Sequence, residues 1–381
     1  MENRVAVTGL GLHTIAGDNI VSNLHSLKKG EGLTSSYDRN WNEITDLSNR
    51  LTINTIKRAV KNCIYDTLKN ATIMDNKGNI NLSNRMIMGV VCGSNFFETS
   101  AWENEIECNV LFWTCNSIIT ELIKEVNVSG PVINVSTACS SGASAIVTAC
   151  QLIESDQADV VIAIGYDFRA RIPENGMKVI GAISKTSIAP FCLNRTGTDL
   201  ADGIGVMVLE KSSIAKSRNT KIYANIIGYG VTSDAFNITA PDPEGKAYEN
   251  AMKLALRRAE IEPSKIQYIN THGSGTPTND EFETRIIKKV FKEHSNKLLL
   301  NSSKSIIGHT LGAAGLIEAI ITVLALETGW IHKTANYTDP DPNCDLNYCT
   351  ESYVDGDFKY AMSNSIGFGG TNVSIVLEKG I

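Results

Sequence analysis

The sequence predicts an α/β fold, in which helices cover a buried sheet. Short apolar runs rich in β-branched residues alternate with longer stretches of helical character, as in layered α/β proteins. The runs are apolar throughout, which is typical of strands covered on both faces. A weak internal repeat further indicates two related halves. With 381 residues and 43% hydrophobic residues, the chain is long enough to bury a large core.

The expected elements follow this alternation along the whole chain. Each strand is assigned where an apolar run is bounded by turn-forming residues, and each helix where apolar residues recur at helical spacing. The strands are expected at 5–8, 86–91, 132–135, 160–164, 205–209, 222–228, 266–270, 298–301 and 373–377. The helices are expected at about 53–69, 140–154, 247–260, 279–293 and 312–327.

The internal repeat consists of a strand, a turn with polar residues, and a helix of small apolar residues. It occurs once at 131–153 (PVINVSTACSSGASAIVTACQLI) and again at 298–326 (LLLNSSKSIIGHTLGAAGLIEAIITVLAL). Small residues allow such a helix to lie close to neighbouring backbone. The polar, basic segment 211–221 is expected to connect the halves on the surface. We therefore predict two domains, 1–215 and 216–381.

Composition excludes several classes of function. A net charge of -6, from 35 basic and 41 acidic residues, argues against binding a nucleic-acid backbone. No run approaches the roughly 18 apolar residues of a membrane span, and the N-terminus lacks the pattern of a signal peptide. A cytoplasmic protein without membrane contact is expected. The nine cysteines contain no C-x-x-C pair, so neither a disulfide framework nor a zinc site is expected.

Cys139 is the candidate nucleophile. It lies in NVSTACSSGASA, where an apolar run ends and a helix begins. Unpaired backbone N–H groups and the helix dipole at such a position stabilise a thiolate, the nucleophilic form of cysteine. The strand–turn–helix context is similar to a nucleophile elbow. The alternative is that Cys139 is an inert buried cysteine. Evidence against it comes only from residues elsewhere in the chain.

Two histidines supply that context. His272 follows the strand expected at 266–270, and His309 precedes the helix expected at 312–327. Functional groups of α/β sheets gather at the carboxyl ends of strands, so both are expected beside Cys139. A thiolate can take an acyl group from a thioester. Two neutral imidazoles can then bind the enolate oxygen formed when a second substrate loses carbon dioxide.

Further candidates lie beside these three residues. Lys304 stands between an apolar run and a glycine turn, which favours burial with Glu318 as its partner. Asp280 follows Pro277 and could cap the next helix. Phe368 lies in SNSIGFGGTN, where glycines permit a tight turn that could direct an N–H group at an oxyanion and carry a movable aromatic ring.

These motifs resemble the β-ketoacyl-acyl-carrier-protein synthases of fatty-acid and type II polyketide synthesis, which have the thiolase fold. The resemblance runs in order along nearly the whole chain. The matching segments are VAVTGLGLHT, STACSSGA, APFCLNRTG, ADGIGVMVLE, TSDAFNITAPDPEG, THGSGTPTND, SSKSIIGHTLGAAGLIEA, DPDPNCDLNY and SNSIGFGGTN.

The resemblance implies a thiolase fold of two similar halves in α-β-α-β-α layers, and a role for each candidate. Cys139 would carry the acyl group, and His272 and His309 would serve decarboxylation and enolate binding. It also implies a dimer that takes its substrates from acyl carrier protein and needs no dissociable cofactor. The remaining roles are support by Lys304, Glu318 and Asp280, oxyanion binding and gating by Phe368, contact with the phosphopantetheine arm by Ser274 and Thr276, a pocket wall at Phe191, and a carrier-protein patch of Arg50, Lys57, Arg58 and Arg195.

Three alternatives stay open. The chain could be a non-catalytic chain-length partner of a heterodimeric synthase, although such partners lack the nucleophile. It could be a non-decarboxylating thiolase-type acyltransferase, although that class carries a second cysteine in the C-terminal glycine loop. It could also be a condensing enzyme specialised for an unusual acyl or polyene chain, because the stretch between Gly93 and Gly130 is shorter than in typical family members.

Overall fold

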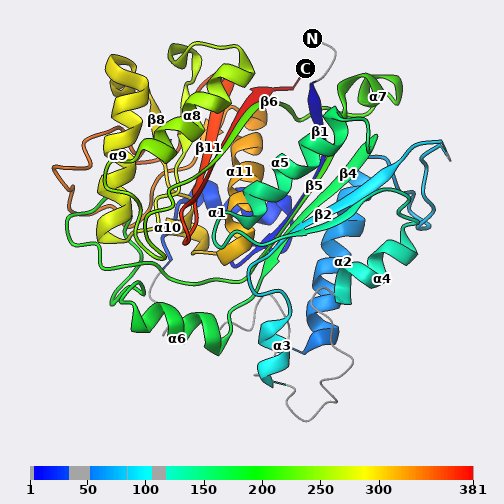
Figure 1. Cartoon of the computed structure of the whole chain (residues 1–381), viewed down its shortest axis with the longest axis horizontal. Coiled ribbons are helices and arrows are strands. Elements are labelled where there is room, and N and C mark those ends of the chain that lie inside the picture. The colour runs from blue at the N-terminus through cyan, green and yellow to red at the C-terminus, as the bar shows by residue number, and fades with distance from the viewer. Residues whose placement is uncertain (1–3, 34–51, 84, 105–116, 381) are drawn as a thin grey trace.

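The computed structural model describes residues 4–33, 52–83, 85–104 and 117–380. One ten-stranded sheet runs through the molecule, with strand order β3-β2-β4-β5-β1-β6-β12-β11-β7-β8. Figure 1 shows helices on both sides of it, as expected for an α/β fold. The strands are β1 (Val5–Thr14), β2 (Met88–Gly93), β3 (Val132–Val135), β4 (Val160–Asp167), β5 (Gly203–Lys211), β6 (Ala224–Ser233), β7 (Tyr268–Asn270), β8 (Leu299–Asn301), β11 (Tyr360–Ile366) and β12 (Thr371–Lys379).

The two ends of the sheet repeat one arrangement. The outer strands β3, β2 and β4 are parallel to one another, as are β8, β7 and β11. The inner strands are antiparallel, and β1 pairs with β6 through only three residue pairs, beginning at Val5 with Ile226. Each half thus has the same strand order and directions. The boundary between residues 215 and 216 stays a prediction.

Two helices lie between the halves of the sheet. α5 (Ser141–Glu154) and α11 (Ala314–Thr328) pack against each other and against strands of both halves. Small residues make this approach possible: a Cβ on Gly142 would lie 2.7 Å from the backbone nitrogen of Leu316. Figure 1 shows this pair at the centre of the molecule.

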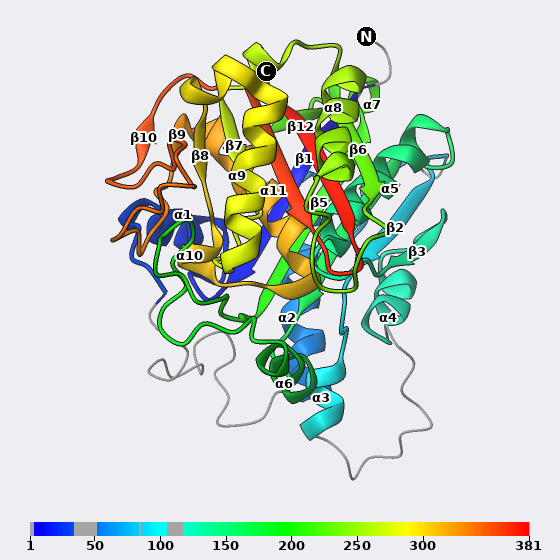
Figure 2. The ribbon, with the colours of Figure 1, turned by 60° about the vertical axis from the view of Figure 1, so that its left-hand side comes forward.

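The outer faces are covered by other helices, which completes the expected α-β-α-β-α layers. α2 (Ile53–Asn70) and α4 (Ser117–Glu125) cover one half, and α8 (Lys246–Ala259) and α9 (Pro277–Phe291) cover the other. At one end of the molecule, α3 and α6 lie side by side (Figure 2). The smaller helices are α1 (Ile20–Lys29), α3 (Thr99–Asn104), α6 (Arg171–Val179), α7 (Ser212–Ser217) and α10 (Lys304–Ile307).

One sequence-based expectation needs correction. The segment Leu311–Thr328 has a mean hydropathy of 1.7 and the length of a membrane span, so the chain does contain such a run. Of this segment, 89% is buried inside the protein. It consists of the core helix α11 and the short turn that precedes it.

All nine expected strands and all five expected helices are present, most with shifted ends. Helices α1, α3, α4, α6, α7 and α10 were not expected, and strand β11 was missed. Its sequence, YAMSNSI, contains the buried polar residues Ser363, Asn364 and Ser365. These interrupt the apolar run that identifies the other strands. A two-stranded hairpin of β9 (Trp330–Ile331) and β10 (Val354–Asp355) was also not foreseen.

Candidate active site

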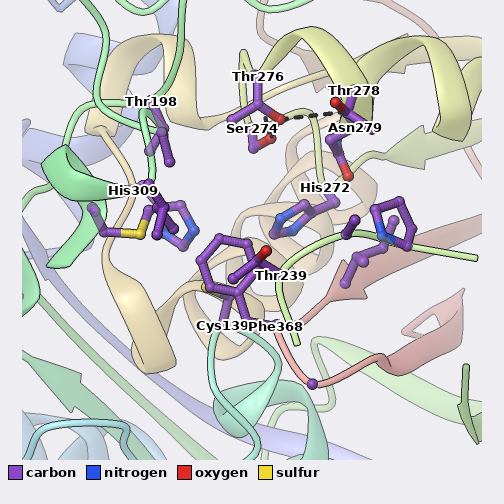
Figure 3. Close-up of a pocket in the computed structure, with 18 of the residues that line it drawn as sticks. Cys139, Thr198, Thr239, His272, Ser274, Thr276, Thr278, Asn279, His309 and Phe368 are labelled. Carbon is purple, nitrogen blue, oxygen red and sulfur yellow. Dashed lines mark hydrogen bonds between the residues drawn. The ribbon is translucent and has the colours of Figure 1, made fainter. Parts of the chain in front are cut away.

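A cavity of about 350 Å³ lies where β3, β7 and β11 end. Figure 3 shows Cys139, His272, His309 and Phe368 around one space. The structure thus brings together, at the carboxyl ends of strands, residues that are 229 positions apart in the chain, from Cys139 to Phe368. Its lining includes the polar residues Ser274 and Thr276, and an apolar part formed by Met177, Ile180, Ala182, Pro241 and Ile366.

Cys139 occupies a sharp turn between β3 and α5. Ala138, just before it, has φ of +51°, a conformation that non-glycine residues seldom adopt. The turn is fixed by its own side chains, since the Ser140 hydroxyl donates to the carbonyl of Thr137 over 2.7 Å and the Ser141 hydroxyl donates to the carbonyl of Ala138 over 2.6 Å. Cys139 is 7% exposed and opens into the cavity.

Burial favours the protonated form of the Cys139 thiol. Burial raises its pKa to about 11, while the Lys304 ammonium and the backbone N–H of Phe368 act in the opposite direction. Desolvation penalises the charged form of a buried thiol. The proton of this thiol therefore has to leave as the sulfur reacts, and stabilisation of the thiolate by the start of α5 stays a prediction.

His309 is held by backbone on both sides. Its N–H donates to the carbonyl of Asp199 over 2.7 Å, and its carbonyl accepts from Ala201 over 3.0 Å. The backbone N–H of Leu311 donates to Nδ1 of the ring over 3.0 Å. Because Nδ1 accepts, the proton of the neutral ring is on Nε2.

His272 has the same tautomer for a different reason. The Lys304 ammonium lies 3.4 Å from Nδ1 of the ring and donates to the backbone carbonyl of His272 over 2.6 Å. An ammonium can only donate, so Nδ1 accepts and Nε2 carries the proton. The two imidazole rings are 5.8 Å apart between centroids, at an interplanar angle of 83°.

Both rings are neutral at pH 7. Burial lowers the pKa of His272 and of His309 well below 6.5, and the nearby Lys304 ammonium lowers both further. Two neutral Nε2–H donors on the wall of one buried cavity can bind an oxygen atom on which negative charge develops.

The ammonium of Lys304 is paired with the carboxylate of Glu318, and both side chains are almost fully buried. Burial raises the pKa of Glu318 to about 7, against the lowering effect of Lys304. A cation this deep needs such a partner, because an uncompensated buried charge is costly. The pairing expected from sequence is present.

The loop that carries His272 is tied to the start of α9. Asp280 accepts the backbone N–H of Gly275 over 3.1 Å. Glu283, one turn further, accepts the N–H groups of His272 and Gly273 over 2.9 and 2.8 Å. Sequence reasoning missed Glu283, although its spacing of three residues from Asp280 on a helix puts both on one face.

Asp167 at the end of β4 was also missed. Its buried carboxylate accepts the N–H groups of Asn95, Phe96 and Gly312 over 2.9, 2.8 and 2.7 Å. It thereby connects the turn after β2 to the loop of His309. A single acidic residue at the end of an apolar strand was the available signal.

The glycine turn between β11 and β12 lies directly on the Cys139 turn. A Cβ on Gly367 would lie 2.6 Å from the carbonyl oxygen of Thr137 and 2.8 Å from Oγ of Ser140. The N–H of Gly369 donates to the carbonyl of Ile238 over 2.7 Å. This contact joins the turn to the loop 234–241, which forms part of the cavity mouth.

Ser274 and Thr276 line the cavity as expected, with their hydroxyl oxygens 2.9 Å apart. Thr276 also caps α9, since its hydroxyl accepts the N–H of Asn279 over 3.4 Å. Thr278 and Asn279 continue this polar wall (Figure 3).

Two expected roles are contradicted. Phe191 is fully buried and stacks on Tyr348, with 3.8 Å between ring centroids, and it is not among the described residues that line the cavity. Arg195 is not part of an exposed patch, because it is 7% exposed and pairs with Asp341. Phe191 belongs to an apolar cluster, whereas Arg195 donates to the backbone carbonyls of Cys192, Thr276 and Pro277.

The other residues of the expected carrier-protein patch are Arg50, Lys57 and Arg58. Arg50 lies outside the described residues. Lys57 and Arg58 are on α2, where Lys57 pairs with Glu121 over 2.5 Å and Arg58 is exposed. Neither residue lines the cavity.

Comparison with known proteins agrees with this geometry. Residues 38–215 match the model of the β-ketoacyl synthase N-terminal domain, and residues 223–338 match that of its C-terminal domain. The chain is 39% identical over 260 residues to a 3-oxoacyl-[acyl-carrier-protein] synthase 2 of Coxiella burnetii, and 38% identical over 265 residues to one of Staphylococcus aureus. These alignments cover 66% and 67% of this chain and 63% of each relative.

Solved structures are similar over almost the full length. One is a type II polyketide synthase ketosynthase, bound to a hexaketide and in complex with its acyl-carrier protein, with a TM-score of 0.87, 26% identity and complete coverage of both chains. Another is a ketosynthase from Xenorhabdus doucetiae in complex with its chain length factor, with a TM-score of 0.81, 25% identity and coverage of 99% and 98%.

Proposed function

We propose a function for this chain on the premise that it belongs to the β-ketoacyl synthase family. The chain catalyses decarboxylative Claisen condensation between an acyl group on Cys139 and a malonyl-type extender on acyl carrier protein, and so forms a β-ketoacyl-carrier protein in fatty-acid or polyketide synthesis. The observation that carries this proposal is the pair of neutral Nε2–H donors of His272 and His309 beside Cys139.

In the first half-reaction, the sulfur of Cys139 attacks the carbonyl carbon of an acyl-carrier thioester. A carbon–sulfur bond to Cys139 forms, and the bond to the carrier's pantetheine sulfur breaks. The Cys139 proton ends on the pantetheine thiol. Burial raises the pKa of the Cys139 thiol to about 11, so its proton must be removed during the attack. The N–H groups of Cys139 and Phe368 bind the oxyanion.

In the second half-reaction, a malonyl-carrier substrate occupies the same cavity. Its bond to the carboxyl carbon breaks, carbon dioxide leaves, and the electron pair moves into an enolate whose oxygen accepts from His272 and His309. The enolate carbon attacks the acyl thioester, and the Cys139 sulfur departs and is reprotonated from solvent. Neutral donors suit this step, because they stabilise the enolate without donating their protons fully.

The substrates arrive on the phosphopantetheine arm of the carrier protein, and no dissociable cofactor is needed. Ser274 and Thr276 offer hydroxyl groups along the polar wall, which suits the amides of such an arm. The carrier protein is therefore the expected partner, and the cytoplasmic location remains a prediction.

We also propose that the chain works as a dimer with itself or with a related ketosynthase-like subunit. Strand β3 lies at one edge of the sheet, and its Val132 is 41% exposed. Such an edge can pair with another chain. Retention of Cys139 and both histidines favours a catalytic subunit over a chain-length partner, and Phe368 stands where a thiolase-type enzyme has a second cysteine.

The proposal is tested by intact-mass spectrometry after the protein is mixed with an acyl-carrier protein. The wild type gains the acyl mass, and Cys139→Ala does not. His272→Ala and His309→Ala still become acylated but no longer release carbon dioxide from malonyl-carrier. Acylation of Cys139→Ala at the wild-type rate, or carbon dioxide release by both histidine variants, would refute the proposed roles.

A further inference from the structure

Thr198 is a cavity-lining residue that the proposed mechanism has not used. Its side chain is fully buried and faces the space bounded by His309, Ser274 and Phe368 (Figure 3). The Oγ1 atom of Thr198 has no hydrogen-bond partner within the described part of the chain. A buried hydroxyl is normally paired, so its free state points to a ligand.

The backbone holds Thr198 rigidly beside the catalytic residues. Its N–H donates to the carbonyl of Ala182, and its carbonyl accepts from Ser184, both over 2.8 Å. The next residue, Asp199, accepts the backbone N–H of His309 over 2.7 Å. The position of the Thr198 backbone relative to His309 is therefore fixed by main-chain bonds.

The charge of the cavity wall limits what this hydroxyl can bind. No lysine or arginine is among the described residues that line the cavity, and Lys304 lies behind His272. The acidic lining residue Asp234 is paired with the amide of Asn372 over 2.7 Å. An anionic substrate group in this cavity therefore depends on neutral donors, and each donor counts for more than it would beside a cation.

We propose that the Thr198 hydroxyl donates a hydrogen bond to the carboxylate of the malonyl-type extender and so selects this substrate. The inference rests on the proposed function. Carboxylate binding is assigned to Thr198 because the two imidazole donors are needed at the thioester oxygen, where the enolate forms.

The assignment predicts which kinetic constant changes. When carbon dioxide leaves, the negative charge moves from the carboxylate to the thioester oxygen, so the Thr198 bond is strongest in the bound substrate and weakens in the transition state. Removing it raises KM for malonyl-carrier without lowering kcat, because the lost bond stabilises the bound substrate more than the transition state. Loss of a hydrogen bond to a charged group is large enough to raise this KM about tenfold.

The variants are Thr198→Val, which keeps the shape and removes the hydroxyl, and Thr198→Ser, which keeps the hydroxyl. The matched control is Thr67→Val, at a buried threonine on α2 whose hydroxyl donates to the carbonyl of Cys63 over 2.6 Å. Steady-state condensation is measured against malonyl-carrier concentration, once with a saturated acyl primer and once with a β-ketoacyl primer.

The expected result is a KM raised about tenfold in Thr198→Val with both primers, and restored to within about threefold of the wild type in Thr198→Ser. Thr67→Val keeps the wild-type KM. The melting temperature of Thr198→Val does not fall, because replacing an unpaired buried hydroxyl by a methyl group removes a polar atom without a partner.

Three results would overturn the inference. An unchanged KM in Thr198→Val would show that the hydroxyl does not bind the extender. A loss in kcat alone would place it on the enolate, and a loss confined to the β-ketoacyl primer would place it on the acyl chain. Failure of the proposed function would instead appear in the wild-type protein, as absence of acylation and of carbon dioxide release.

Discussion

The backbone N–H of Leu311 donates a hydrogen bond of 3.0 Å to Nδ1 of His309. Leu311 has φ of +53°, so the chain accepts an uncommon conformation at this residue. Because the donor is a peptide group, it cannot titrate, and the ring keeps its Nε2–H tautomer at every pH at which it is neutral. His272 depends instead on the side chain of Lys304, and the two histidines should therefore respond differently to substitution.

The decarboxylation rate should show no inflection near pH 6.5. The pKa values of His272 and His309 are lowered well below 6.5, first by burial and then by Lys304. Both donors therefore stay neutral as the pH falls through the ordinary histidine range. Carbon dioxide release measured under saturating malonyl-carrier from pH 8 to pH 5.5 should stay flat. A loss with a midpoint near 6.5 would contradict the neutral pair.

Lys304→Met should introduce an acid limb into that profile. Removing the ammonium takes away an effect that lowers the pKa of His272, so the pKa rises and protonation begins at a higher pH than in the wild type. The matched measurement is the pH profile of decarboxylation for both proteins. An unshifted profile in a folded variant would show that Lys304 does not control the charge of His272.

The same variant should be less stable, by about 3–5 kcal/mol at pH 8, because it leaves the Glu318 carboxylate buried without its partner. Glu318 has a pKa raised to about 7 in the folded protein, so the folded state binds its proton more readily than the unfolded state does. The loss should shrink as the pH falls from 8 to 5.5. Chemical unfolding at both pH values checks this, and Lys304→Met combined with Glu318→Gln should recover part of the stability at pH 8.

Arg195→Met should destabilise the fold rather than weaken carrier binding through lost surface charge. Arg195 is buried, pairs with Asp341 and lies 3.9 Å from Asp280. Removing it leaves buried carboxylates unpaired, at a cost of about 3 kcal/mol or more. The exposed Arg58 provides the control, since Arg58→Met should change the melting temperature by less than about 2 °C. Equal melting temperatures of the two variants would contradict the buried role.

Gly367→Ala should lower the rate of Cys139 acylation by at least about tenfold. The added methyl group would lie 2.6 Å from the carbonyl oxygen of Thr137, so the turn that presents the nucleophile must move. Gly369→Ala is the comparison: nothing lies within 4 Å of its Cβ, and only its φ of +82° is unfavourable. Its acylation rate should fall less. The rates come from time-resolved intact mass, and equal rates in the two variants would exclude steric contact as the cause.

The strands and helices could be predicted where burial leaves a simple pattern. Most of the expected strands are apolar runs buried in the sheet. Strand β11 was not predicted because Ser363, Asn364 and Ser365 are polar residues that the surrounding structure buries. Periodicity records the average environment of a residue, and it fails where a core contains polar groups.

The site could be predicted in part. Cys139, His272, His309, Lys304 and Phe368 were each found from their turns beside strands and helices, and the structure places all of them at or behind one cavity. Glu283 and Asp167 were missed because their role is to accept backbone N–H groups from other loops. The sequence near a carboxylate does not show which distant backbone N–H groups it will accept. Arg195 was misplaced for the same reason, since its carboxylate partner Asp341 is far away in the chain.

The α/β class, the order of nearly all strands and the residue types available for acyl transfer can be predicted from the sequence, because they depend on local patterns of hydrophobicity and turn formation. Which side chains meet, where their protons lie and what charges they carry depend on the packing of distant segments. The neutral Nε2–H state of His272 and His309, the raised pKa of Cys139 and the unpaired hydroxyl of Thr198 all arise from burial next to residues distant in the chain. Desolvation and hydrogen bonding of this kind exist only once the layers have packed together.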